Sequence, residues 1–184
     1  MLKLYGGVRS RASIVQWYLE ELNVPYEFVL LDMAAGEHRQ PEFLAINPMG
    51  KVPAIVDGEV KLWESGAIIL YLAEKYGNLP KSLVERSIIS QWILFANSTL
   101  ATGLFVEASR DKETLQLLTP LNELLANQPY ILGDDLSVAD IALGSILAYV
   151  PMMLPIDLNP YPAVLDYIKR INDRSAFQKT IGKR

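Results

Sequence analysis

The sequence predicts a small α/β domain with the element order β-α-β-α-β-β-α, followed by an all-helical domain. Three observations predict this division. Short apolar runs alternate with helical patterns up to Tyr76, whereas helical periodicity alone continues after residue 81. The intervening segment 77–81, with the sequence GNLPK, has the turn-rich composition of a linker. We therefore expect one domain at residues 1–76 and a second at residues 82–184.

The first domain opens with the pattern of a strand, a helix and a second strand. Residues 2–5 predict a short strand, and a stripe of apolar side chains over residues 10–22 predicts a helix. Residues 26–31 predict another strand, which fits a right-handed parallel crossover from the first. A polar, irregular stretch follows, and residues 41–46 predict a short helix.

A hairpin and a helix are predicted to complete this domain. Two short apolar runs, 54–56 and 60–63, flank the pair Asp57-Gly58, which is a strong sequence signal for a hairpin turn. Val52 comes before the first run and is followed by a proline, whose peptide bond can adopt the cis form. Ser65 then occupies the expected N-cap of the last helix. The free N–H groups at that helix start favour a bound carboxylate.

The second domain shows helical periodicity throughout. Its predicted helices cover residues 82–109, 112–126, 137–149 and 161–172. Pro120 should interrupt or bend the second of them, because proline cannot donate the backbone hydrogen bond of a helix interior. Ser137 with Asp140 three residues later resembles a capping box, with Asp in place of the usual Glu. We therefore expect Asp140 to stabilise a helix start and to have no catalytic role.

Composition excludes several kinds of site and partner. The 184 residues include no cysteine, which excludes disulfides, a cysteine nucleophile and thiolate metal sites. A net charge of −4 disfavours a nucleic-acid partner, since such proteins need a basic face. The N-terminus lacks the apolar core of a signal peptide, and the longest uncharged run, 141–156, is shorter than the ~20 residues of a spanning helix. We expect a cytoplasmic protein without a membrane segment.

Four stretches of the sequence resemble those of cytosolic glutathione transferases, and the resemblance covers essentially the whole chain. They are residues 36–39 (GEHR), 47–53 (NPMGKVP), 64–68 (ESGAI) and 136–140 (LSVAD). The first half is similar to the thioredoxin-like domain of that family, and the second half is similar to its helical domain. The helical half is short, as in compact bacterial Ser-type members such as the chi class.

The resemblance implies an enzyme that ionises the thiol of glutathione and adds it to small electrophiles, with isothiocyanates among the expected acceptors. Glutathione would be a co-substrate, no metal would be required, and the protein would act as a homodimer in detoxification. A free thiol with a pKa near ~8.5 is only a few per cent ionised at pH ~7. Lowering that pKa by ~2 units requires about 2.7 kcal/mol of preferential thiolate stabilisation. A hydroxyl donor, a helix N-terminus and a nearby cation can supply it.

Two hydroxyls compete for the contact with the thiolate. By resemblance to Ser-type members of the family, Ser10 occupies the position of the activating serine, whereas by resemblance to Tyr-type members Tyr5 is the activator. We favour Ser10, because it lies at the predicted helix start, where the helix dipole acts. The alternatives are that Ser10 is a plain N-cap and that Tyr5 is a strand-end aromatic in the core. Ser13 is a third candidate, and Arg11 either brings positive charge to the thiolate or is a solvated residue of the first turn.

The resemblance assigns glutathione contacts to seven residues: His38, Arg39, Lys51, Val52, Pro53, Glu64 and Ser65. Val52 would pair its backbone N–H and C=O with the cysteinyl part of the tripeptide, like an added strand. Glu64 and Ser65 would hold the γ-glutamyl amine and carboxylate, and Ser65 would cap the helix at the same time. The three basic residues of the set would face the glycyl carboxylate.

Two other functions are compatible with the same motifs. A glutathione-dependent isomerase of maleyl-type diacids would share the Ser-type loop and would require basic residues near the acceptor, for which Arg9 and Arg11 are the candidates. A non-catalytic glutathione-transferase-like module for protein interaction would need no tripeptide site, so the intact pairs Val52-Pro53 and Glu64-Ser65 argue against it. A cysteine-based reductase of the same fold is disfavoured by the absence of cysteine.

Overall fold

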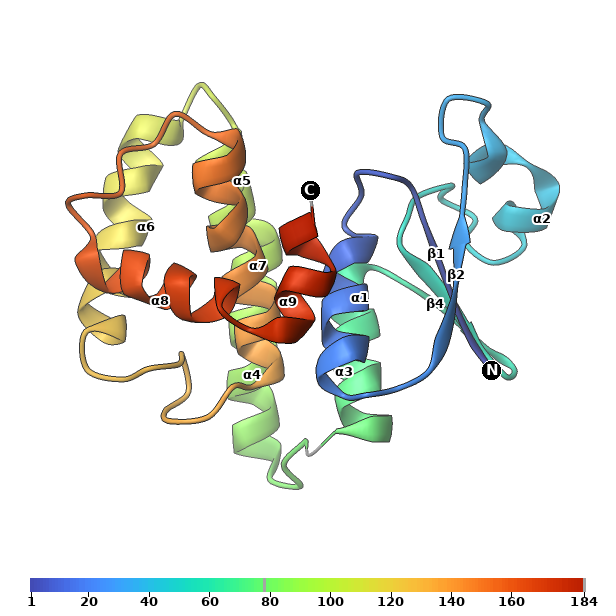
Figure 1. Ribbon diagram of the computed structural model, residues 1–184, viewed down its shortest axis with the longest axis horizontal. Coiled ribbons are helices and arrows are strands. Elements are labelled where there is room, and N and C mark those ends of the chain that lie inside the picture. The colour runs from blue at the N-terminus through green and yellow to red at the C-terminus, as the bar shows by residue number, and fades with distance from the viewer. Residues whose placement is uncertain (78, 184) are drawn as a thin grey trace. The chain divides into compact units, whose positions relative to one another are not determined.

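The computed structural model describes residues 1–77 and 79–183 (Figure 1). Contacts between residues divide the chain into two compact units. The first comprises the described residues of 1–79 and 179–184, and the second comprises residues 80–178. The last residues of the chain thus group with the first unit, whereas the sequence pattern assigned them to the helical domain.

Residues 1–76 of the first unit have the predicted β-α-β-α-β-β-α order, with the short 3₁₀ helix η1 added. Their elements are β1 Leu2–Gly6, α1 Ala12–Glu21, β2 Tyr26–Leu30, η1 Glu37–Arg39, α2 Pro41–Leu44, β3 Ala54–Asp57, β4 Val60–Trp63 and α3 Ser65–Tyr76. The sheet order is β2-β1-β3-β4. Strand β1 runs parallel to β2 and antiparallel to β3, and β3 runs antiparallel to β4. The prediction of a thioredoxin-like α/β domain is therefore confirmed.

The main core of this unit lies between the sheet and two helices. Figure 1 shows α1 and α3 together on one face of the sheet and α2 on the opposite side. Leu2 and Leu4 of β1 are buried whereas Tyr5 is half-buried, as expected for a strand whose alternate side chains face the main core. Trp17 of α1 and Ile68 of α3 are fully buried. Burial of a large apolar side chain contributes on the order of 2–3 kcal/mol.

The turn of the hairpin lies one residue later than the sequence predicted. Asp57 pairs with Val60, so the two-residue loop is Gly58-Glu59 and not Asp57-Gly58. Gly58 has a φ of +61°, as a type II′ loop requires at its first position. Asp57 is therefore the last residue of β3, and its side chain is free to contact a helix.

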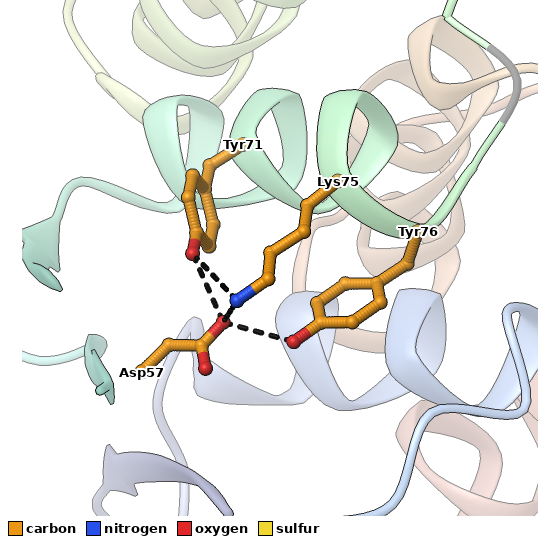
Figure 2. A network of polar contacts seen from close by, with 4 residues as sticks. All are labelled: Asp57, Tyr71, Lys75 and Tyr76. Atoms are coloured by element: carbon orange, nitrogen blue, oxygen red, sulfur yellow. Dashed lines mark hydrogen bonds and ion pairs between the residues drawn. The ribbon is translucent and has the colours of Figure 1, made fainter.

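A cluster of four residues, called the Asp57 clasp below, ties this hairpin to the C-terminal half of α3. Figure 2 shows that Oδ2 of Asp57 accepts hydrogen bonds from the hydroxyls of Tyr71 at 3.0 Å and Tyr76 at 2.9 Å. The ammonium of Lys75 donates to the same oxygen at 2.6 Å. Partial burial disfavours the charged carboxylate, but the three hydrogen bonds outweigh it and lower the pKa of Asp57.

The second unit is built from helices. They are α4 Leu83–Leu94, the π-helical segment η2 Phe95–Leu100, α5 Ala101–Phe105, α6 Arg110–Leu125, α7 Val138–Met153, α8 Pro162–Asn172 and α9 Ser175–Lys179. The 3₁₀ helix η3 Ile181–Lys183 follows α9 and groups with the first unit. The helix predicted over 82–109 thus contains a π-helical segment and ends at Phe105. Helix α6 continues through Pro120 without ending there. Helix α9 was not predicted, because five residues carry too little periodicity.

Helix α7 supplies much of the core of the second unit, since its residues 138–150 are all buried. The predicted capping box is present: the N–H and the hydroxyl of Ser137 both donate to Asp140, at 2.9 and 2.7 Å. The other carboxylate oxygen of Asp140 accepts from the N–H of Ile131 at 2.8 Å and from the hydroxyl of Tyr167 at 3.0 Å. Burial nevertheless raises the pKa of Asp140. These four donors give Asp140 a structural role, as expected.

The stretch from α4 to α5 is continuous. Its 23 residues, Leu83–Phe105, are long and apolar enough to cross a membrane by length and composition alone. Core helices of soluble proteins pass the same test, and one third (33%) of the most apolar window is buried within this protein. This helix is therefore weak evidence for a membrane segment.

Candidate functional site

The strand register brings four chain segments to one end of the sheet. Tyr5 near the end of β1 pairs with Ala54 at the start of β3, and Ala54 pairs with Trp63 at the end of β4. Gly6 pairs with Leu30, the last residue of β2. The segments that follow β1, β2 and β4 and the segment that precedes β3 therefore meet at this end, which we call the site end.

The predicted site residues are distributed over these segments: Ser10 and Arg11 after β1, His38 and Arg39 after β2, Lys51, Val52 and Pro53 before β3, and Glu64 and Ser65 after β4. Tyr5 belongs to β1 itself. His38 and Arg39 lie farther from their strand end than the other site residues do. The carbonyl oxygen of His38 is nevertheless close to Gly50, because a Cβ atom built on Gly50 would lie only 3.1 Å from that oxygen. The structure thus brings residues from four separate stretches of sequence to one end of the first unit.

The hydroxyl of Ser10 holds the loop between β1 and α1. Its Oγ accepts the N–H groups of Gly7 at 3.1 Å and Ala12 at 3.3 Å and donates to the carbonyl of Gly7 at 3.0 Å. Helix α1 begins at Ala12 with Arg11 as its N-cap, two residues later than predicted. A hydroxyl that accepts two N–H bonds is polarised and becomes a stronger donor. Ser10 can therefore exchange its bond to the Gly7 carbonyl for a charge-assisted bond to an anion, which is about twice as strong.

The other hydroxyl candidates have different surroundings. Tyr5 is half-buried, and its ring packs against Phe43 of α2 with ring centroids 5.8 Å apart. Ser13 is buried, and its hydroxyl donates to the carbonyl of Ser10 at 3.1 Å. Ser13 therefore supports the loop backbone, while the choice between Ser10 and Tyr5 as the thiolate contact stays a prediction.

Asn47 organises the segment before β3, a role that the sequence reasoning missed. This residue is 1% exposed. Its side-chain amide donates to the carbonyl of Lys51 at 2.7 Å, and its carbonyl oxygen accepts the N–H of Met49 at 3.0 Å. Gly50, at φ +60°, completes the turn, and the Val52-Pro53 peptide bond that follows is cis. The signal was present in the pattern N-P-x-G, because an asparagine side chain commonly bonds the backbone two residues on.

Basic side chains gather beside this segment. Lys51 and Arg39 are exposed, and His38 is half-buried. The Nδ1 atom of His38 is buried without a hydrogen-bond partner among the described residues. Such an unpaired group costs about 1–3 kcal/mol. The turn that carries His38 is held by Asp32, whose N–H donates to the carboxylate of Glu37 at 2.7 Å.

The junction between β4 and α3 is strained. Glu64 has φ +70° and ψ +118°, a conformation that non-glycine residues rarely adopt. Such strain costs of order 1–3 kcal/mol and is found mainly at functional sites. The prediction that Ser65 is the N-cap is wrong, because Glu64 is the N-cap and Ser65 is the first helical residue, 3% exposed. The exposed carboxylate of Glu64 therefore stands at a helix N-terminus that can bind an anion.

These features suit a peptide-like ligand that carries charge at both ends. A helix N-terminus with an adjacent carboxylate can hold an amino-acid head group, and the basic residues can hold a second carboxylate. Val52 lies just before the first ladder pair of β3, where an extended peptide can add. Among the described residues, no group of three or more His, Cys, Asp and Glu side chains comes together to hold a metal ion.

Two family models match the chain. The model described as "Glutathione S-transferase, N-terminal domain" matches residues 1–74, and the model described as "Glutathione S-transferase, C-terminal domain" matches residues 106–175. The two matches together cover more than half of the chain, on both sides of the boundary between the two units.

Individual proteins agree with these matches. The disulfide-bond oxidoreductase YfcG of Escherichia coli (strain K12) is 34% identical over 100% of this chain and 95% of its own. The theta-class glutathione S-transferase of Xanthomonas axonopodis pv. citri, solved with glutathione bound, superposes with a TM-score of 0.82 at 30% identity over 98% of this chain and 96% of its own. A glutathione transferase of Burkholderia graminis, with two glutathione molecules bound per subunit, gives a TM-score of 0.85 at 29% identity, covering 97% and 86%.

Proposed function

The chain belongs to the glutathione S-transferase family, and we propose that it binds glutathione at the site end and activates its thiol for addition to small electrophiles. The observation that carries this proposal is the strand register, which groups the Ser10 loop, the Val52-Pro53 pair and the Glu64-Ser65 step at one end of one sheet. We propose that one tripeptide ligand contacts all three.

In the proposed complex each part of glutathione meets a matching group. The γ-glutamyl carboxylate lies at the N-terminus of α3 beside Ser65, and the carboxylate of Glu64 holds the γ-glutamyl amine. The cysteinyl backbone pairs with Val52 in antiparallel fashion. The glycyl carboxylate faces Lys51, Arg39 and His38. The unpaired Nδ1 atom of His38 supports this assignment, since the ligand or a water molecule that it orders would satisfy that atom.

Ser10 is the proposed donor to the thiolate. Its Oγ already accepts two backbone N–H groups, which supports strong donation to an anion. Ser10 also precedes the N-cap of α1 by one residue, near the helix end where the dipole favours negative charge. Arg11, the N-cap of α1, adds positive charge nearby. Ionising most of the bound thiol at neutral pH requires about 2.7 kcal/mol of preferential thiolate stabilisation. One charge-assisted hydrogen bond with a helix dipole has this magnitude.

The acceptor proposal is addition to isothiocyanates and similar unsaturated electrophiles. The glutathione thiolate attacks the electron-poor central carbon, a C–S bond forms, and the nitrogen takes a proton, so no group leaves. The experiment is to incubate the protein with glutathione and benzyl isothiocyanate and to measure the dithiocarbamate product against the uncatalysed rate. If the protein does not accelerate the reaction with isothiocyanates but does accelerate the reaction with an aryl halide, the proposed acceptor class is wrong. The transferase proposal would then stand with aryl halides as acceptors.

A second candidate function is glutathione-dependent reduction of disulfides. Two observations favour it: a full-length relative is named a disulfide-bond oxidoreductase, and a structural neighbour holds two glutathione molecules per subunit. Because this chain has no cysteine, both thiols must come from glutathione. One thiolate attacks the substrate disulfide and releases one thiol, and a second attacks the mixed disulfide to give oxidised glutathione and the other thiol. Stoichiometric oxidised glutathione from bis(2-hydroxyethyl) disulfide would identify this reaction.

We also propose a twofold homodimer. Leu83 and Leu94 of α4 are 79% and 67% exposed, and both line a shallow hollow with Arg86, Ser90 and Gln91. An exposed apolar helix face of this kind is typical of a surface that a second copy covers. We further propose that the protein acts in the cytoplasm. The net charge of −4 disfavours a nucleic-acid partner.

An interaction module without catalysis predicts a different result at the same site. Retention of the protein on immobilised glutathione, with release by free glutathione, is expected for the proposed function. A protein that passes through unretained would have no tripeptide site and would favour the interaction module.

A further inference from the structure

Met33 packs on the loop that carries Ser10. A Cβ atom built on Gly7 would lie 2.8 Å from Cγ and 3.5 Å from Sδ of Met33, so the methionine side chain rests directly against the Gly7 backbone. The Oγ of Ser10 bonds both the N–H and the carbonyl of that same residue. Met33 is 39% exposed, so it is not a residue of the buried core.

The segment that carries Met33 is itself fixed to the sheet. The N–H of Leu31 donates to the carbonyl of Gly6 at 2.9 Å, which extends the pairing of β1 with β2 by one residue. Asp32 then accepts the N–H groups of Ala34 and Ala35, each at 2.9 Å. Met33 lies between these anchors, so its backbone is held on both sides and its side chain extends from a fixed point toward Gly7.

We propose that Met33 is a positioning residue for thiol activation: it holds the Gly7 peptide in place so that Ser10 keeps its orientation toward the glutathione sulfur. The proposal rests on the proposed function, in which Ser10 donates to the thiolate. When Ser10 turns its proton toward the sulfur, its bond to the Gly7 carbonyl is lost. Packing by Met33 then remains to keep the Gly7 N–H aimed at Oγ. A flexible thioether fits the glycine backbone closely and leaves no room for a Cβ atom there.

This role differs from that of the neighbouring Gly6. A Cβ atom at Gly6 would lie 2.4 Å from Cβ of Ala12 and 2.9 Å from the ring of Phe28, so Gly6 is required for α1 to approach the sheet. The short contacts of Gly7 are to Met33 alone, since the next atom, Cβ of Ser10, is 3.9 Å away. Substitutions at Gly7 and Met33 can therefore test one contact without disturbing the helix packing.

The test compares Met33→Ala, Met33→Leu and the control Val60→Ala, which truncates a side chain of similar exposure (38%) in β4. The first readout is the ultraviolet absorbance of bound glutathione thiolate against pH. The second is the pH profile of kcat/KM for the electrophile, measured at saturating glutathione. Met33→Ala should raise the pKa of the bound thiol by about one unit, which gives about a tenfold loss of kcat/KM below that pKa and almost none above pH ~9. Met33→Leu and Val60→Ala should keep the wild-type profile. An equal loss at every pH, or no loss, would overturn the proposal.

A double-mutant cycle isolates the contact between Met33 and Gly7 from any general effect of either substitution on folding. Gly7→Ala should displace Met33 and raise the thiol pKa, whereas its effect should shrink in a Met33→Ala background, where the added methyl meets no side chain. Additive effects would contradict the proposed contact. Ser10→Ala belongs in the same series: if it leaves the thiol pKa unchanged, the role of Ser10 and this inference both fall. If Ser10→Ala shifts the pKa and Met33→Ala does not, this inference alone is wrong.

Discussion

Removing the acceptor of the Asp57 clasp should lower the stability of the first unit and leave the chemistry at the site end unchanged. The hydroxyls of Tyr71 and Tyr76 each donate one hydrogen bond to Asp57. Each such bond has a net value of about 1 kcal/mol. The ion pair with the exposed ammonium of Lys75 adds little, because water and salt screen it. We therefore expect Asp57→Ala to cost about 2 kcal/mol, and each of Tyr71→Phe and Tyr76→Phe to cost about 1 kcal/mol.

The clasp should also make stability depend on pH in acid. The pKa of Asp57 is lowered in the folded protein. The stabilisation by its carboxylate is therefore present above the unfolded-state pKa of ~3.9 and is lost as pH falls through the lower, folded value. Asp57→Asn should remove this contribution, so the variant should lose less stability than the wild type between pH ~5 and pH ~3.

The assay is urea unfolding followed by tryptophan fluorescence in a Trp92→Phe background, so that the signal comes from Trp17 and Trp63 of the first unit. Glu59→Ala is the matched control, because Glu59 is an exposed carboxylate on the same hairpin. The free energy of unfolding should fall for Asp57→Ala and stay within about 0.5 kcal/mol for Glu59→Ala, as for ordinary surface changes. Equal values for the two variants would refute the clasp, and a change in KM for glutathione would refute its separation from the site.

Three further predictions concern the site and the α4 surface. Glu64→Gly should relieve the positive-φ strain and stabilise the protein by about 1 kcal/mol. The same change should weaken glutathione binding, measured by calorimetry, and weaker binding without a gain in stability would contradict the strain argument. Asn47→Ala should free the carbonyl of Lys51, lower stability by about 1–3 kcal/mol and raise KM for glutathione more than it changes kcat; an unchanged KM would exclude a role in the site. Leu94→Glu should convert the proposed dimer into monomers in analytical ultracentrifugation; a dimer that persists would move the interface elsewhere.

The element order of the first unit could be predicted because it follows local signals. Alternating apolar runs and glycine or proline breaks mark each strand and helix of this unit. In the second unit, the pair Ser137 and Asp140 likewise marked the start of α7 correctly. The grouping of the candidate site could also be anticipated, since strands that alternate with helices bring their ends together. These features depend on residues a few positions apart, which the sequence displays directly.

The differences arise where a distant contact or unusual backbone geometry decides the local structure. Asp57-Gly58 is a favourable turn pair, but Tyr71, Lys75 and Tyr76 of α3 hold Asp57 in the strand, so the loop forms one residue later. Ser65 is a better N-cap than glutamate by propensity, yet the chain places Glu64 there at positive φ. The packing of Met33 on Gly7 joins residues 26 positions apart, and neither residue carries a local signal of the contact.

The most direct test of the central claim is the absorbance of bound glutathione thiolate as a function of pH, measured for the wild type, Ser10→Ala and Tyr5→Phe. We predict that the bound thiol of the wild type has a pKa about two units below the free value of ~8.5, that Ser10→Ala returns it close to that value, and that Tyr5→Phe leaves it lowered. The reverse pattern would transfer activation to Tyr5. A wild-type protein that binds no glutathione and shows no thiolate near neutral pH would contradict the proposed function itself.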